Sequence, residues 1–115
     1  MKSGNSDKTH IAFALATDTG RLMAFPSTDE AESACPGGDV EKGMWLFFSE
    51  DGSPLEARFR RPANGTYVLL RAVSGLWLQE RLEQVQSVTG CGLTTLPEVV
   101  EHLKIERGKR AARGI

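Results

Sequence analysis

The sequence predicts a single α+β domain, a mainly antiparallel sheet of about five strands with two or three helices packed on one face. Three observations predict it. The chain has 115 residues, close to the commonest size of a one-core domain. Several short runs alternate apolar with small or polar residues, as strands do. Two other stretches begin with residues that start helices.

The first predicted elements are a β-hairpin and a short helix. Residues 11–16 alternate bulky and small side chains, Asp18-Thr19-Gly20 supplies a turn, and residues 21–25 return as a strand. Ser27 and Glu30 fit a capping box at the start of a helix over about 28–35. Pro36-Gly37-Gly38 is expected to stop that helix.

Residues 43–73 predict three consecutive antiparallel strands. The run 43–49 is apolar enough for a central strand, and Asp51-Gly52 turns the chain. Residues 55–60 alternate, which gives one buried face and one solvated face. Asn64-Gly65 is the strongest two-residue hairpin signal, so 66–73 is expected to form the third strand.

Residues 74–88 fit two structures. Leu78, Leu82 and Val85 recur at helical spacing, which favours a helix. Ser74-Gly75 is equally consistent with a turn into another strand. After a Gly-rich loop, the last helix is announced by a capping threonine, an early proline and a glutamate, and carries an apolar stripe: Thr95, Pro97, Glu98 and then Leu96, Val99, Val100, Leu103.

The predicted domain spans residues 10–105. Residues 1–9 are polar and are expected to be disordered, and 106–115 are expected to form a flexible basic tail. No apolar run approaches the roughly 18–20 residues that span a bilayer. The start lacks the long apolar core of a signal peptide, so we expect a cytoplasmic protein that does not contact membranes.

Metal, cofactor and thiol chemistry have little support in the sequence. Two cysteines and two histidines are too few and too widely spaced for a structural zinc site. The acids between 39 and 51 lack the spacing of a calcium-binding loop, and residues 36–39 lack the Lys and Ser/Thr of a phosphate-binding loop. We therefore expect no metal and no cofactor. Cys35 and Cys91 are expected to be free thiols, although the sequence does not fix the distance between them.

Charge is unevenly distributed, although the net charge is only −1. Residues 28–57 hold eight acids and one base, whereas residues 58–78 hold four bases and no acid. Arg58 and Arg60 share the solvated face of one predicted strand, and Arg71 lies on its neighbour. Trp77 follows closely and is a residue type that dominates binding interfaces. These four residues form the candidate partner-binding surface.

Three functions follow from these observations. The leading hypothesis is a non-enzymatic protein-binding module of the regulator, adaptor or inhibitor/immunity type, because segregated charge steers a protein to a complementary partner. The second is nucleic-acid binding through the arginine face and the basic tail. The third is a small enzyme that uses Cys35 or Cys91 beside a histidine. A solvated face with ordinary Glu–Arg pairs explains the same arginines without a partner. A free edge strand would also allow a homodimer.

One resemblance concerns the middle third of the chain. It rests on Phe25-Pro26-Ser27 with Glu30-Ala31-Glu32, on Asp39-Val40-Glu41 with Gly43, and on Phe47-Phe48 with Asp51-Gly52-Ser53-Pro54-Leu55. In these segments the chain resembles small stand-alone bacterial α+β proteins of uncharacterised function. The resemblance implies no activity and assigns no functional residue.

Overall fold

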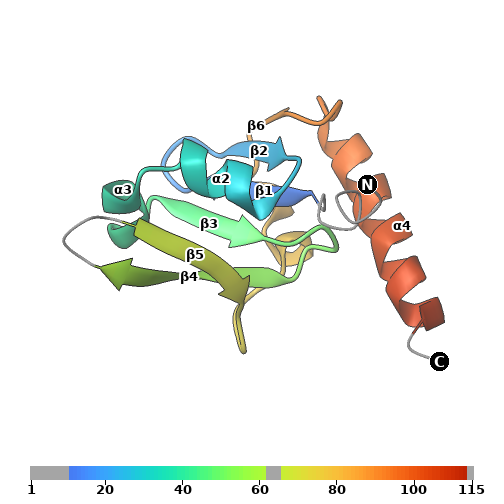
Figure 1. Ribbon diagram of the computed structural model, residues 1–115. Helices are drawn as coiled ribbons and strands as arrows, with labels where there is room; N and C mark the ends of the chain where they lie inside the picture. The colour runs from blue at the N-terminus through green and yellow to red at the C-terminus, as the bar shows by residue number, and fades with distance from the viewer. Residues whose placement is uncertain (1–10, 62–65, 114–115) are drawn as a thin grey trace, which may run out of the picture.

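The sheet of this protein has six strands in the order β5-β4-β3-β1-β2-β6 (Figure 1). The computed structural model describes residues 11–61 and 66–113, and their side chains over 11–59 and 67–108. The strands are β1 (Ala12–Ala16), β2 (Arg21–Phe25), β3 (Trp45–Phe48), β4 (Pro54–Arg61), β5 (Thr66–Arg71) and β6 (Ser87–Thr89). The helices are α2 (Thr28–Ala34), α3 (Gly37–Glu41) and α4 (Leu96–Arg113), with 3-10 turns η2 (Leu78–Glu80) and η3 (Leu82–Gln84). The α+β prediction is confirmed, with one strand more than expected.

The hairpin and the meander are also confirmed. β1 pairs antiparallel with β2, and β3, β4 and β5 follow one another antiparallel. β3 is central, because its second edge pairs with β1. The Asn64-Gly65 turn lies outside the described residues, but the strands on either side of it pair antiparallel, with a bulge between Phe59 and Arg61.

Helices cover both faces of the sheet, which corrects the prediction of one face. Phe13 and Leu15 of β1 pack in a core with Val99 and Leu103 of α4. The alternate residues of β1, which are alanines, pack in a second core with α2. All five residues of β1 are buried, and a strand buried on both faces needs cover on both sides.

The segment 74–88 forms neither the single helix that we favoured nor one long strand. It folds as η2 and η3, followed by the short strand β6. Leu78 of η2 is fully buried in the core below α4. β6 then pairs parallel with β2, and the long connection between them, from α2 through β5 to η3, provides the crossover that a parallel pair requires. Leu82 and Val85 therefore have helical spacing because both pack against the same core from η3 and the residue that follows it.

The helical ends also differ from expectation at two places. α4 continues to Arg113 instead of ending before a tail at 106, since Glu, Lys, Arg and Ala are good helix formers. Pro36, predicted to be a stop, is also the N-cap of α3, where a proline lacking an N–H is tolerated. Residues 1–9 lie outside the described chain. None of the described helices is long and apolar enough to cross a membrane.

Candidate functional site

The structure does not bring the candidate arginines together. In the β4–β5 register Arg58 is opposite Val68, whereas Arg71 is opposite Leu55. Opposed residues point to the same face and successive residues alternate, so Arg58 and Arg71 lie on opposite faces of the sheet. Arg58 is engaged by Glu56 of its own strand, at 3.2 Å between Nη2 and Oε2. The prediction that Arg58 and Arg71 share one surface is therefore wrong. The side chain of Arg60 lies outside the described residues.

Trp77 belongs to a different contact. Its half-buried ring lies below the guanidinium of Arg107 of α4, 5.0 Å from Cζ to the ring centroid. Its backbone N–H donates to the carboxylate of Glu80 at 3.0 Å. The contact between Trp77 and Arg107 therefore connects the start of η2 to α4 through a cation–π interaction.

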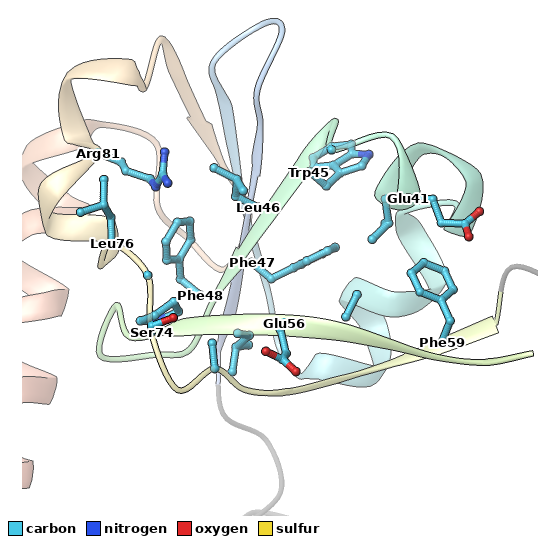
Figure 2. A pocket seen from close by; sticks show the side chains of 17 residues that line it. Glu41, Trp45, Leu46, Phe47, Phe48, Glu56, Phe59, Ser74, Leu76 and Arg81 are labelled. Atoms are coloured by element: carbon cyan, nitrogen blue, oxygen red, sulfur yellow. The ribbon is translucent and has the colours of Figure 1, made fainter. Parts of the chain in front are cut away.

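A cleft opens where β3 and β4 separate. The two strands pair at only two positions, Phe47 with Leu55 and Phe48 with Pro54. Beyond them the strands diverge, as Figure 2 shows. The resulting cavity has a volume of about 530 Å³ and is lined mainly by apolar and aromatic side chains. This size and lining are typical of ligand-binding clefts.

The narrow end of the cleft is fixed by a buried turn. Asp51 is only 1% exposed, and its Oδ1 accepts hydrogen bonds from the Ser49 and Ser53 hydroxyls at 2.6 and 2.8 Å. The Gly52 carbonyl accepts from the Leu78 N–H at 2.8 Å, and Gln79 Nε2 donates to the Asp51 carbonyl at 2.8 Å. The acid of this turn therefore has a structural role. Among the described residues no group of three His, Cys, Asp or Glu side chains is placed to hold a metal ion.

Backbone polar groups line the two walls where the strands separate. Along β4, even-numbered residues bond to β5, because the Ala72 N–H donates to the Pro54 carbonyl at 3.1 Å. The odd-numbered peptide groups therefore point toward β3. The peptide groups of Leu55 pair with those of Phe47. The peptide groups of Ala57 have no β3 partner in the described sheet. By the same alternation, the peptide groups of Trp45 point from β3 into the cleft.

Charged groups stand at opposite sides of the cleft. Glu41, at the end of α3, lies near Trp45 and Phe59 (Figure 2). Arg81, between η2 and η3, lies on the other side with Leu46 and Leu76 (Figure 2). Neither Glu41 nor Arg81 has an ion-pair partner among the described side chains. The cleft thus has an apolar interior with one acid and one base at its borders.

The thiol hypothesis gains no support from the two cysteines. Cys35 is buried, and burial raises the pKa of its thiol to about 11, with a further contribution from the Asp39 carboxylate. Cys91 is exposed by comparison, yet partial burial also raises its pKa. A raised pKa disfavours the thiolate, which is the nucleophile. His10 lies outside the described residues, and the ring of His102 packs against Phe13.

Comparison with known proteins gives no relative: no family model, no curated protein and no solved structure matches this chain. The resemblance to small bacterial proteins stays a prediction. The candidate site therefore rests on geometry. Sequence reasoning missed the cleft because it placed a strand over 43–49, whereas β3 has only four residues. The eight-residue β4 pairs with β3 only at Pro54 and Leu55, so the rest of its edge faces the cleft.

Proposed function

We propose that the protein is a non-enzymatic binding module for another protein, and that the β3–β4 cleft is its recognition surface. This keeps the leading hypothesis but moves the surface away from the arginines. We further propose that the module acts in the cytoplasm as a regulator, adaptor or inhibitor.

One observation carries the proposal: exposed apolar residues lie in the lining of an apolar cleft and next to it. Val73 is 100% exposed and Leu76, which lines the cleft, is 45% exposed. Leu70 is exposed on the neighbouring strand, directly opposite Glu56 of the cleft wall. Exposed apolar residues that cluster beside a concavity mark interaction sites, whereas scattered ones do not. These residues add exposed apolar surface next to the cleft.

The test compares this surface with an apolar residue elsewhere. A partner captured with the tagged protein and identified by mass spectrometry is purified, and its affinity is measured for Leu76→Asp and Val73→Asp. Ile105→Asp is the matched control, because Ile105 is 49% exposed but lies on α4. We expect Leu76→Asp to weaken binding by about tenfold or more, which corresponds to about 1.4 kcal/mol, and the control to leave it unchanged. Equal affinities of Leu76→Asp and Ile105→Asp for the partner would contradict the proposal.

A salt titration of binding to the captured partner distinguishes the protein-binding hypothesis from the nucleic-acid hypothesis. Contacts with phosphates give a steep fall of affinity with salt concentration, whereas an apolar interface gives a shallow one. A steep slope, together with insensitivity to Leu76→Asp, would favour the nucleic-acid hypothesis instead.

A further inference from the structure

We propose that the partner presents an extended segment, which enters the cleft as an additional strand between β3 and β4. This inference rests on the proposed function and specifies the chemistry of the partner: a strand-forming peptide with apolar side chains, with a basic side chain on the face toward Glu41 and an acidic side chain on the face toward Arg81.

The first argument is the pattern of backbone groups. Ser49 donates its N–H to the Ser53 carbonyl at 2.8 Å, so Phe47 with Leu55 is the next hydrogen-bonded pair. Continuing that register, Trp45 and Ala57 would pair next. The strands have separated by then, and both residues offer an N–H and a carbonyl to the cleft. A ligand with alternating donors and acceptors would satisfy both walls, and an extended peptide has that pattern.

The second argument is the placement of side chains on the two sides of the gap. Trp45 and Phe59 follow the alternation that puts them on the α2 side of the sheet, with Val40 of α3 beside them. Leu46 faces the opposite side, where Leu76 also lines the cleft. Successive side chains of an inserted strand would point alternately to these two apolar walls.

The third argument is charge. Glu41 and Arg81 border the cleft on opposite sides, and neither has an ion-pair partner among the described side chains. A basic side chain beside Glu41 and an acidic one beside Arg81 would complement both.

The β5 edge of the sheet is partly occupied by α2. The Leu69 N–H, which points away from β4, donates to the Glu32 carboxylate of α2 at 2.9 Å. The Tyr67 hydroxyl donates to the Cys35 carbonyl at 2.7 Å, which holds the end of α2 over β5. Side chains that occupy edge donors are a common protection against strand pairing. Strand addition at the β5 edge would therefore have to displace Glu32 from Leu69.

The experiment uses a displayed library of random linear heptapeptides as the probe. Selected peptides are synthesised, and amide hydrogen exchange of the full-length protein is followed by NMR with and without peptide. In the free protein the Ala57 amide should exchange faster than those of Glu56 and Arg58, which bond to β5. With peptide, we expect the Ala57 exchange rate to fall by about tenfold or more and the other two to change little.

A pair of variants tests the same donor. Ala57→Pro removes the N–H that points into the cleft without removing a bond to β5, and Ala57→Val keeps the N–H at similar volume. We expect the proline variant to bind about tenfold more weakly than the valine variant. Peptide binding that leaves Ala57 exchange unchanged, or equal affinities of the two variants, would overturn strand addition. So would a library without any peptide that protects Ala57. The proposed function would still stand or fall on Leu76→Asp against its control.

Discussion

Alanine substitution at three glycines is expected to change the free energy of unfolding by different amounts, and the largest loss is expected at Gly52, in the turn at the narrow end of the cleft. Gly52 has a φ of +92°, and a Cβ there would lie too close to the Gln79 side-chain oxygen. Gly43 has a φ of +77° but open space around it. Gly38, in α3, has open space and no positive φ. The series therefore separates backbone strain from side-chain collision.

The magnitudes follow from these geometries. A positive φ costs an alanine about 1–2 kcal/mol, which is the expected loss of unfolding free energy for Gly43→Ala. Gly52→Ala also displaces Gln79 from its 2.8 Å hydrogen bond to the Asp51 carbonyl, adding about 1 kcal/mol. Its total of about 2–3 kcal/mol should lower Tm by roughly 10 °C. Gly38→Ala should stabilise slightly, by about 0.5–1 kcal/mol, because alanine favours a helix.

Urea unfolding followed by circular dichroism measures all three variants. The double variant Gly52→Ala with Gln79→Ala isolates the collision, since removing Gln79 should reduce the cost of Gly52→Ala to that of Gly43→Ala. The reasoning is refuted if Gly52→Ala costs no more than Gly43→Ala, because the contact with Gln79 would then carry no energy.

Two further predictions concern pH. The raised pKa of Cys35 means that the folded state keeps its thiol proton where the unfolded chain loses it, so stability should fall as pH rises from 9.0 toward about 11. Cys35→Ser should show a smaller fall in alkaline urea titrations, and an identical fall would contradict the assignment. Hydrogen bonds from Thr94 and Thr95 lower the pKa of Glu98. Their stabilisation is present above the ordinary carboxyl pKa and is lost as pH falls through the folded value, so Glu98→Gln should flatten the acid limb of stability, and an unchanged limb would count against this account.

Local signals in the sequence predicted most elements correctly. Ser27 accepts a hydrogen bond from the Glu30 N–H at 3.2 Å, which is the first of the two bonds of the predicted capping box. Thr95 and Glu98 exchange hydrogen bonds at the start of α4, again as expected. These contacts connect residues three apart, so a short stretch of sequence contains both partners. Pairing between distant segments was less predictable. Residues 87–89 contain no local signal that predicts parallel pairing with β2.

The candidate site was harder to predict for the same reason. Whether Arg58 and Arg71 share a face depends on the β4–β5 register, and a shift of one residue moves a side chain to the opposite face. The β4–β5 pair contains a bulge between Phe59 and Arg61, and the sequence does not predict its position. The cleft depends on where β3 stops pairing with β4, which is decided by contacts that both strands make elsewhere.

Those contacts show that the cleft is imposed by the fold. At the far end of β3, the Met44 carbonyl accepts from the Thr17 N–H at 3.0 Å and the Met44 N–H donates to the Asp39 carbonyl at 3.0 Å. β1 and α3 therefore hold that end of β3, while the full length of β4 pairs with β5. The Asp51 turn holds the two strands together at the near end. With one end fixed together and the other ends bound to different neighbours, β3 and β4 separate beyond the Phe47–Leu55 pair. The peptide groups of Trp45 and Ala57 that point into the gap have no partner across the described β3–β4 pair, and a buried peptide group needs a hydrogen-bond partner, which a ligand in the cleft can supply.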